Sequence, residues 1–461
     1  MINPAIFRQY DIRGVWEKDL TPAVVELIGK GFASYLLKAV NKEKAKISVG
    51  RDARLHSPAI RDSLIKGLTG SGIDVIDLGV CPTPLQYYSM YKLSLDGGVM
   101  ITGSHNPPEF NGFKLSVGKT TIFGEAIQDI RKIIDANDFK SGSGSVEEYP
   151  VTGDYINFLK EKFGSLSGIK VVVDAGNGTG GLVAPEIMKA LGADVVELYC
   201  EPDGNFPNHH PDPTVEKYLT ALIAKVKEVK AHVGIGYDGD ADRIGAIDED
   251  GNIIWGDKLM IIFSRDILKD NPGAKIIGEV KCSQTLYDDI AAHGGMPVMW
   301  KTGHSLIKEK LKEEHALLAG EMSGHLFFAH RYFGYDDAIY ASLRLLEIIK
   351  NAGEPYSMKA LLKDVPYTVA TPEIRFDCPD EIKFIIAGKA QEAFNEYPSI
   401  TIDGIRIQFD DGWALIRASN TQPVLVLRFE AQSEKRLSEI KSFVEERLNK
   451  IIEEYKSRDK K

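Results

Sequence analysis

Short apolar runs alternate with stretches of helical periodicity along the first three quarters of the chain. In the helical stretches, for example 22–37 and 58–70, apolar residues recur every three or four positions. Short β-rich runs separated by such helices are typical of parallel, helix-covered sheets. The pattern occurs three times and predicts three successive α/β units. The predicted strands are 46–50, 73–78 and 98–102 in the first unit, 170–174, 194–199 and 232–236 in the second, and 275–280, 296–300 and 316–319 in the third.

The last quarter of the chain has a different pattern. Consecutive strands are followed there by one long helix, at 434–455, which indicates an antiparallel α+β unit instead of a fourth parallel one. The strands are expected near 371–376, 400–408, 413–417 and 424–431. With boundaries near 150, 253 and 366, the predicted domains are 1–150, 151–253, 254–366 and 367–461.

Composition narrows the class of protein. The 43% hydrophobic and 26% charged residues are typical of a globular enzyme, and 461 residues suggest three or four domains. A net charge of −10 argues against a broad nucleic-acid-binding face. We expect no membrane span and no signal peptide, because no apolar run is long enough and no basic leader begins the sequence. Four cysteines without a CxxC pair predict reduced thiols and a cytoplasmic location.

A turn containing glycine and two prolines, Thr102–Pro108, follows the apolar run that ends at Ile101. A buried strand cannot continue through Gly103 and the prolines, so Ser104 and His105 lie at the carboxyl end of a strand. Open α/β sheets place their ligands at this end. The turn therefore predicts a reactive serine, with an ordinary capped turn as the alternative.

Three aspartates, Asp238, Asp240 and Asp242, alternate directly after the strand predicted at 232–236. Their repulsion disfavours a continued strand or helix unless a cation gathers them, and a hard divalent ion suits these oxygen ligands. A calcium-binding EF-hand is excluded because Arg243 stands at its glycine position and strand-like runs flank the loop. The guanidinium of Arg243 suggests a phosphate neighbour. A solvated acidic turn without metal is the alternative.

A third polar turn follows the strand at 316–319. It combines the carboxylate of Glu321, the hydroxyl of Ser323 and the imidazole of His325, which together can hydrogen-bond several sugar hydroxyls. Lys281 and His304 follow the other two strands of the same unit and can converge on the same mouth. A capped turn is the alternative interpretation.

The fourth polar turn lies between two predicted strands of the last unit. It holds Arg417, Ser419, Asn420 and Thr421, and its guanidinium, hydroxyls, amide and backbone N–H groups can form an anion cradle. A polar hairpin without a ligand is the alternative. The sequence thus offers one polar turn in each predicted domain.

Two adjacent histidines, His209 and His210, lie in a proline-rich loop and suggest a second metal site. The separated third ligand that zinc requires is missing from this stretch. We therefore expect these histidines to pack the loop.

The four turns, in this order and spacing, resemble those of the α-D-phosphohexomutase superfamily. The matching stretches are Thr102–Pro108, Asp238–Arg243, Gly320–His325 and Arg417–Thr421. The segment from Tyr10 to Gly14 extends the resemblance to nearly the whole chain, and Glu-Met-Ser in the third turn is most similar to the bacterial phosphomannomutase/phosphoglucomutase branch. Ala53 and Ala241 stand where many members have glycine, and we expect neither to affect the chemistry.

The resemblance implies an α/β fold of three similar mixed-sheet domains and a C-terminal antiparallel α+β domain around a central cleft. It implies a phosphoryl group on Ser104, held against one Mg²⁺ ion by Asp238, Asp240 and Asp242. Such a phosphoserine is a phosphoryl donor whose developing charge is already compensated. The implied reaction converts a hexose 1-phosphate to the 6-phosphate through a hexose 1,6-bisphosphate, which acts as intermediate and activator.

The resemblance also implies roles for the other side chains. Lys114 or His325 transfers a proton to and from the reacting hydroxyl, and Glu321 and Ser323 bind sugar hydroxyls. The side chains that neutralise charge around the phosphoserine are Arg13, His105, Lys114 and Arg243. The further substrate contacts are Tyr10, Lys281, His304, His325, Arg417, Ser419, Asn420 and Thr421.

Three alternatives to this mutase are open. A phosphoglucosamine mutase typically has Glu-Gln-Ser where this chain has Glu321-Met322-Ser323, which disfavours that activity. The others are a Mg²⁺-dependent sugar phosphatase and a non-catalytic sugar-phosphate-binding protein. Small hexose phosphates are the expected partners; nucleic acid, membrane, organic cofactor and obligate protein partner are not expected. Retention of a bisphosphate further predicts hinge rotation of the last domain near Pro366.

Overall fold

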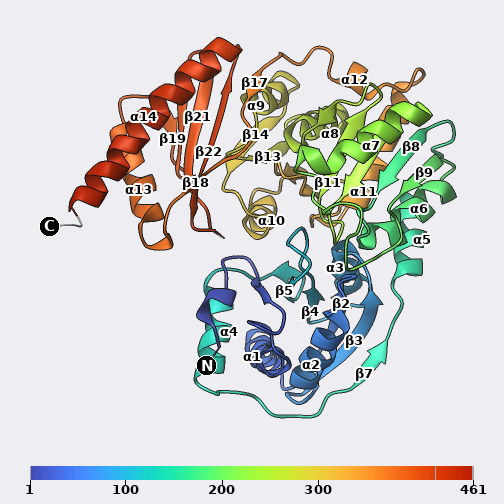
Figure 1. The fold of residues 1–461 in the computed structure, drawn as a ribbon. Helices are drawn as coiled ribbons and strands as arrows, with labels where there is room; N and C mark the ends of the chain where they lie inside the picture. The colour runs from blue at the N-terminus through green and yellow to red at the C-terminus, as the bar shows by residue number, and fades with distance from the viewer. Residues whose placement is uncertain (1, 421, 459–461) are drawn as a thin grey trace.

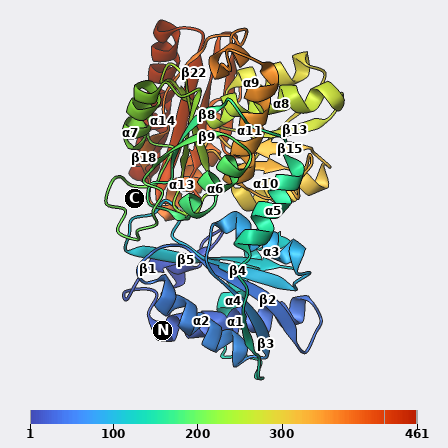
Figure 2. The same cartoon turned by 90° about the vertical axis from the view of Figure 1, so that its right-hand side faces the viewer.

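The computed structural model describes residues 2–420 and 422–458. This part of the chain forms four sheets in sequence order, three mixed and one antiparallel, which confirms the predicted fold class (Figure 1). The first domain lies below the other three in both views (Figures 1 and 2). The last domain, in red, lies at the upper left in Figure 1. None of the described helices is long and apolar enough to cross a membrane.

The first sheet has the order β1-β5-β4-β2-β3-β7, with β6 beside β5. Its parallel strands β2, β3 and β4 are the three predicted ones. The antiparallel strand β5, which lies between β1 and β4, was not predicted. Strand β5 matters for the site because it carries Lys114. The elements are η1 (Pro4–Ile6), β1 (Ile12–Val15), α1 (Pro22–Ala39), β2 (Ala45–Arg51), α2 (Ser57–Thr69), β3 (Ile73–Val80), α3 (Thr83–Lys92), β4 (Gly97–Ile101), β5 (Phe110–Val117), β6 (Thr120–Thr121), α4 (Glu125–Asp135) and β7 (Val146–Glu148).

The second sheet has the order β12-β11-β10-β8-β9. Strands β8, β9 and β10 are parallel, as the sequence predicts, and β11 returns antiparallel to β10. The turn between β10 and β11 holds the three aspartates. The elements are α5 (Thr152–Lys162), β8 (Lys170–Asp174), η2 (Thr179–Leu182), α6 (Ala184–Ala190), β9 (Asp194–Leu198), α7 (Glu216–Val229), β10 (Val233–Tyr237), β11 (Ile244–Asp248) and β12 (Ile253–Ile254).

The third sheet has the order β14-β13-β15-β16. Strands β13, β14 and β15 are parallel, so the turns after them meet at one edge of the sheet. Lys281, His304 and Glu321 lie just beyond these three strand ends. The elements are α8 (Gly256–Asp270), β13 (Lys275–Glu279), α9 (Gln284–Ala292), β14 (Met296–Trp300), α10 (His304–Glu313), β15 (Leu318–Gly320), β16 (Leu326–Phe328), α11 (Ala338–Ala352) and α12 (Met358–Leu361).

The fourth sheet is antiparallel, with the order β17-β22-β21-β20-β19 and β18 beside β22. Helix α13 was not predicted: its residues Phe384 and Ile385 are 57% and 44% exposed, and these outward apolar side chains blur the helical period. The strand expected at 400–408 is two strands, because the chain turns at Gly404 with a φ of 75°. The elements are β17 (Val369–Ala370), β18 (Ile374–Asp377), α13 (Asp380–Ala393), β19 (Ser399–Ile400), β20 (Ile405–Phe409), β21 (Gly412–Ala418), β22 (Val424–Ala431) and α14 (Glu434–Arg458).

The described residues form several hydrophobic cores, and one of them belongs to the first domain alone, between its sheet and helices α1, α2 and α4. One continuous core runs from helix α3 of the first domain through β8 and β10 to α8 and α11 of the third. The last domain has a separate core between its sheet and helices α13 and α14. A small apolar seam of Val280, Trp413 and Leu415 joins the last domain to the third. The apolar contact between the last domain and the third is therefore small.

Candidate active site

Ser104 lies in the turn after β4 and is 3% exposed. Its φ is 48°, a left-handed conformation that is unfavourable for a residue with a Cβ. Its backbone N–H donates to Thr102 Oγ1 at 2.8 Å, and its Oγ donates to Asp238 Oδ2 at 2.8 Å. The turn of the first domain thus aims the serine hydroxyl at the acidic turn of the second.

Asp238, Asp240 and Asp242 are fully buried, and one ligand oxygen from each lies within 4.8 Å of the others. Oδ1 of Asp240 and Oδ1 of Asp242 accept no hydrogen bond from the residues that the structure describes. Burial and the two neighbouring carboxylates raise the pKa of Asp238 well above its usual value. Buried, partly unsatisfied carboxylate oxygens are the donor set that a hard divalent cation takes, so these residues fit Mg²⁺.

Lys114 reaches the aspartates from β5. Its Nζ donates to Asp240 Oδ2 at 2.9 Å and also contacts Asp242 Oδ2. Although burial opposes its charge, these carboxylates raise the pKa of Lys114 well above its usual value. Thr83 Oγ1 donates to the same oxygen of Asp240 at 2.5 Å, a contact that nothing in the local sequence of Thr83 indicates. Lys114 therefore remains a cation next to the acidic turn.

Two arginines flank the serine turn. Arg13 on β1 donates to the carbonyl oxygen of Gly103 at 3.1 Å and to Asn106 Oδ1 at 2.9 Å. The backbone N–H of Arg243 donates to Asp238 Oδ1 at 3.1 Å. Burial, assisted by both arginines, lowers the pKa of His105 well below its usual value, so its ring is a neutral neighbour of Ser104. The positive charge around the serine comes from the arginines and Lys114.

His325 connects this charge cluster to the third domain. Arg243 Nε donates to His325 Nε2 at 2.9 Å, which assigns the ring proton to Nδ1. The ring of His304 stacks against His325 with centroids 5.6 Å apart, and Tyr10 meets His304 edge-on at 6.0 Å. Three residues predicted from separate stretches therefore lie in contact.

The carboxylate of Asp336 lies beside the same histidine and was not predicted. His325 Nδ1 is 3.7 Å from Asp242 Oδ1 and 3.3 Å from Asp336 Oδ2. The other oxygen of Asp336 accepts from Lys308 Nζ at 3.0 Å, and the charge of Lys308 helps to hold the pKa of Asp336 well below its usual value against the effect of burial. Among the described residues, Asp242, His325 and Asp336 form a second buried group with the spacing of metal ligands, and it shares Asp242 with the acidic turn.

The third-domain turns are tied together by carboxylates. Glu321 Oε1 accepts from the backbone N–H of Gly303 at 2.7 Å, and Ser323 Oγ lies 3.4 Å from Glu321 Oε2. Glu279, at the end of β13, accepts from the N–H of Met322 at 2.9 Å and from the hydroxyl of Thr302. Glu279 is fully buried and was not predicted, because a single carboxylate at a strand end is no motif. It fixes the turn that presents Glu321 and Ser323.

Two further predicted cations, Lys281 and Arg417, are already paired with carboxylates. Lys281 Nζ donates to Glu373 Oε1 at 2.6 Å, and Arg417 Nε donates to Asp403 Oδ2 at 3.0 Å. Although burial opposes its charge, Glu279 and Glu373 raise the pKa of Lys281. A phosphate that binds here has to compete with these carboxylates.

Asn420 brings the last domain to the first. Its Nδ2 donates to Tyr10 Oη at 2.7 Å, and Tyr10 Oη donates to the carbonyl oxygen of Thr302 at 2.9 Å. Ser419 Oγ accepts from the N–H of Gln422 at 3.2 Å. Thr421, the last residue predicted for this turn, lies outside the described residues. Through these contacts Tyr10 links the turns of the first, third and last domains.

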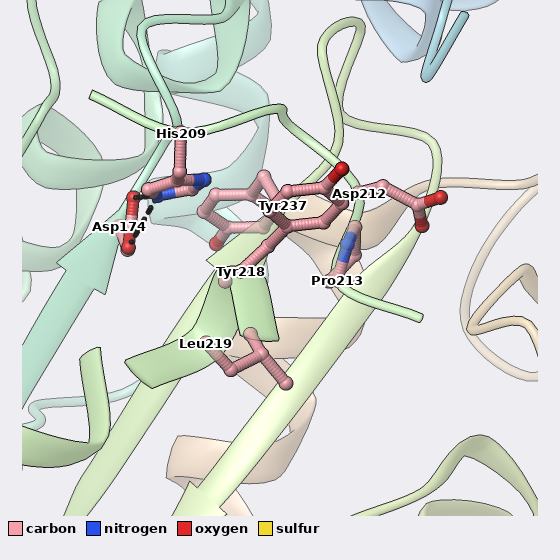
Figure 3. Close-up of a pocket in the computed structure, with 8 residues that line it drawn as sticks. Asp174, His209, Asp212, Pro213, Tyr218, Leu219 and Tyr237 are labelled. Carbon is pink, nitrogen blue, oxygen red and sulfur yellow. Dashed lines mark hydrogen bonds and ion pairs between the residues drawn. The ribbon is translucent and has the colours of Figure 1, made fainter. Parts of the chain in front are cut away.

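His209 and His210 each contact a residue outside their own loop. His209 Nε2 faces both carboxylate oxygens of Asp174 at 3.0–3.1 Å, beside a small hollow that Tyr218 and Tyr237 also line (Figure 3). His210 Nε2 donates to the carbonyl oxygen of His105. Among the described residues, neither histidine belongs to a group of three metal-ligating side chains.

Comparison with known proteins identifies the family of this chain. It matches all four domain models of the phosphoglucomutase/phosphomannomutase family, the alpha/beta/alpha domains I, II and III at residues 4–141, 153–251 and 255–367 and the C-terminal domain at 373–447. It is 46% identical over 449 residues to a Pseudomonas aeruginosa phosphomannomutase/phosphoglucomutase, covering 97% of this chain and 96% of that one. It is 44% identical over 460 residues to a Neisseria gonorrhoeae phosphoglucomutase, covering 98% and 97%.

A solved structure agrees with these matches. The crystal structure of a phosphoglucomutase/phosphomannomutase family protein from Burkholderia thailandensis has a TM-score of 0.92 and 42% identity, with 98% of each chain covered. A likeness of this extent includes all four domains and the turns between them. The chain belongs to the phosphoglucomutase/phosphomannomutase family of the α-D-phosphohexomutase superfamily.

Proposed function

We propose that this protein interconverts hexose 1-phosphates and hexose 6-phosphates, with Ser104 as the phosphoryl carrier. The observation that carries the proposal is the 2.8 Å hydrogen bond from Ser104 Oγ to Asp238, which joins a buried hydroxyl to the acidic turn of another domain. The family and the names of its relatives support the same reaction class.

Asp238, Asp240 and Asp242 would hold Mg²⁺ together with the phosphoserine. When bound, the ion compensates charge on the phosphoryl group as it leaves Ser104. Arg13, Arg243 and Lys114 add positive charge at the same place. Phosphoryl transfer depends on positioning and charge compensation, and the chain supplies both around Ser104.

The first half-reaction breaks the Ser104 Oγ–P bond and forms a bond between phosphorus and the free hydroxyl oxygen of the sugar phosphate. Lys114 and His325 are the two predicted groups for transfer of the hydroxyl proton. The raised pKa of Lys114 favours its protonated form, and the hydrogen bond from Arg243 occupies Nε2 of His325, so either group has to release its present partner before it accepts the proton. The second half-reaction returns the other phosphoryl group to Ser104. The bisphosphate turns over between the two.

The second phosphate and the sugar are gripped by the last two domains. Glu321 and Ser323 would bind sugar hydroxyls in both orientations. The side chains placed to hold the phosphate that is not reacting are Lys281, His304, Arg417, Ser419, Asn420 and Thr421. Tyr10 links the first domain to the third and the last through its contacts with Thr302 and Asn420. Rotation of the last domain near Pro366 would exclude water once the substrate is bound.

Both mannose and glucose phosphates are proposed substrates. These epimers differ only at C2, and a site that accepts the sugar in two orientations has no fixed contact for that hydroxyl. The P. aeruginosa relative is named for both sugars, the Neisseria relative for glucose. Kinetics with the two 1-phosphates at equal enzyme concentration should agree within about tenfold in kcat/KM, which corresponds to about 1.4 kcal/mol. The buried thiols of all four cysteines support a cytoplasmic location.

Intact-mass spectrometry tests the role of Ser104. Treatment with glucose 1,6-bisphosphate should add one phosphoryl group to the protein and none to Ser104→Ala, and that variant should lose hexose phosphate isomerisation. A coupled assay for inorganic phosphate separates the phosphatase alternative: steady phosphate release without isomer exchange would contradict the mutase. Full turnover by Ser104→Ala would remove Ser104 from the reaction.

A further inference from the structure

One buried arginine forms hydrogen bonds with the backbone of the serine turn. Arg54, which follows β2, is 1% exposed. Its Nη2 donates to the carbonyl oxygens of Ser104 at 2.9 Å and Asn106 at 2.6 Å. Its Nη1 donates to those of Pro107 at 2.5 Å and Phe110 at 3.0 Å. A single guanidinium therefore binds four carbonyl oxygens of the segment that contains the proposed phosphoryl carrier.

Arg54 is itself fixed in orientation. Its Nε donates to Asp52 Oδ2 at 3.1 Å, and the same oxygen accepts from the backbone N–H of Gly103 at 2.9 Å. Ser57 Oγ donates to the other oxygen of Asp52 at 2.6 Å. A Cβ at Gly103 would lie 2.3 Å from Arg54 Nε, so only glycine lets the turn approach this closely. Asp52 and Arg54 thus contact the turn on both sides of the peptide that joins Gly103 to Ser104.

This attachment coincides with the unfavourable backbone of Ser104. A residue with φ of 48° keeps that conformation only where its surroundings impose it. Asp52 accepts a hydrogen bond from the N–H of Gly103, the residue before Ser104, and Arg54 donates to the carbonyl oxygen of Ser104 itself. Lysine cannot replace this contact, because an ammonium has three donors around one atom whereas the planar guanidinium spreads five over a fork.

We propose that Arg54 is a positioning residue for phosphoryl transfer, which keeps Ser104 Oγ aimed at the acidic turn whether or not it carries a phosphoryl group. This inference rests on the proposed function of Ser104. Nη1 and Nη2 of Arg54 donate to backbone carbonyl oxygens and not to the hydroxyl of Ser104. Loss of the fork should therefore affect the rate of transfer more than the binding of sugar phosphates, most of whose proposed contacts are in other domains.

The test is Arg54→Lys, with Arg344→Lys as matched control. Arg344 is also fully buried and pairs with Asp266, but it lies on α11 and has no contact with the serine turn. We expect kcat of Arg54→Lys to fall about 100-fold, as for a misplacement of about 1 Å, while KM stays within about threefold. Arg344→Lys should keep kcat within about twofold, even if both variants lose thermal stability.

The loading of Ser104 separates this inference from the proposed function. The rate of phosphoryl transfer from glucose 1,6-bisphosphate, followed by intact mass in single turnover, should fall in Arg54→Lys by the same factor as kcat. If Arg54→Lys does not fold, Asp52→Asn keeps the guanidinium but loosens its anchor, and it should slow loading about tenfold. Loading at the wild-type rate in a folded variant would overturn the role of Arg54. Absence of loading in the wild type would instead refute the role of Ser104.

Discussion

Replacing Lys114 by methionine removes the cation that contacts two of the three buried aspartates. Methionine has a similar length and no charge, so the change isolates the electrostatic contribution. Lys114 is 3% exposed, and Asp240 and Asp242 are fully buried. Removing one partner of a buried ion pair costs about 3–5 kcal/mol, because the other charge stays buried without compensation. We expect a loss of about 4 kcal/mol in the free energy of unfolding of the metal-free protein.

The assay is urea denaturation with a chelator present, applied to Lys114→Met, Asp240→Asn and the double variant. The double variant should regain at least half of the loss of Lys114→Met, because it has one fewer uncompensated charge. Lys450→Met is the matched control: Lys450 is 66% exposed in a helical pair with Glu446, and its loss should stay below about 0.5 kcal/mol. If Lys114→Met behaves like this control, or if the two single losses simply add, the electrostatic account of the acidic turn is wrong.

Two further predictions concern pH and shape. Although burial opposes its charge, the hydrogen bond to Asp174 raises the pKa of His209. A raised folded pKa means that the protonated ring stabilises the protein below about pH 6.5 and that this contribution is lost as the pH rises through the folded value. The stability difference between wild type and His209→Gln should therefore shrink by about 1 kcal/mol from pH 5.5 to 9, as followed by thermal unfolding, and a difference that grows with pH would contradict it. The rotation of the last domain can be tested by small-angle scattering. A compact chain of this length has a radius of gyration of about 23 Å, and we expect this radius to fall by a few per cent when hexose phosphate binds. An unchanged radius would count against the rotation.

Local pattern predicted the parallel strands because each is an apolar run between helical periods. Strand β5 was missed since it reads Phe110-Asn-Gly-Phe-Lys114-Leu, where glycine, asparagine and lysine interrupt the run. Those polar residues are buried by contacts with distant parts of the chain, as in the pairing of Lys114 with Asp240. Helix α13 was missed for the opposite reason, because apolar side chains on its outer face hide the period.

The candidate site divides in the same way. Ser104 and the three aspartates lie in turns whose composition already suggests a reactive group or a cation. Glu279 and Asp336 act through single carboxylates, and their partners Met322 and His325 lie 43 and 11 residues away in sequence. Arg54 was not predicted, because its four carbonyl partners exist only once the turn after β4 folds over it. Residues that hold a turn are found from contacts, and residues that perform chemistry are found from composition.

The separate core of the last domain has a consequence for how such a protein can change over time. The seam of Val280, Trp413 and Leu415 is small and shares no residue with the acidic turn or the serine turn. On the proposed function, a substitution in this seam alters how often the bisphosphate escapes before its second transfer, while the rate of each transfer is unchanged. Leakage of the intermediate and speed of the reaction can therefore be adjusted independently, one at the seam and the other at the serine turn.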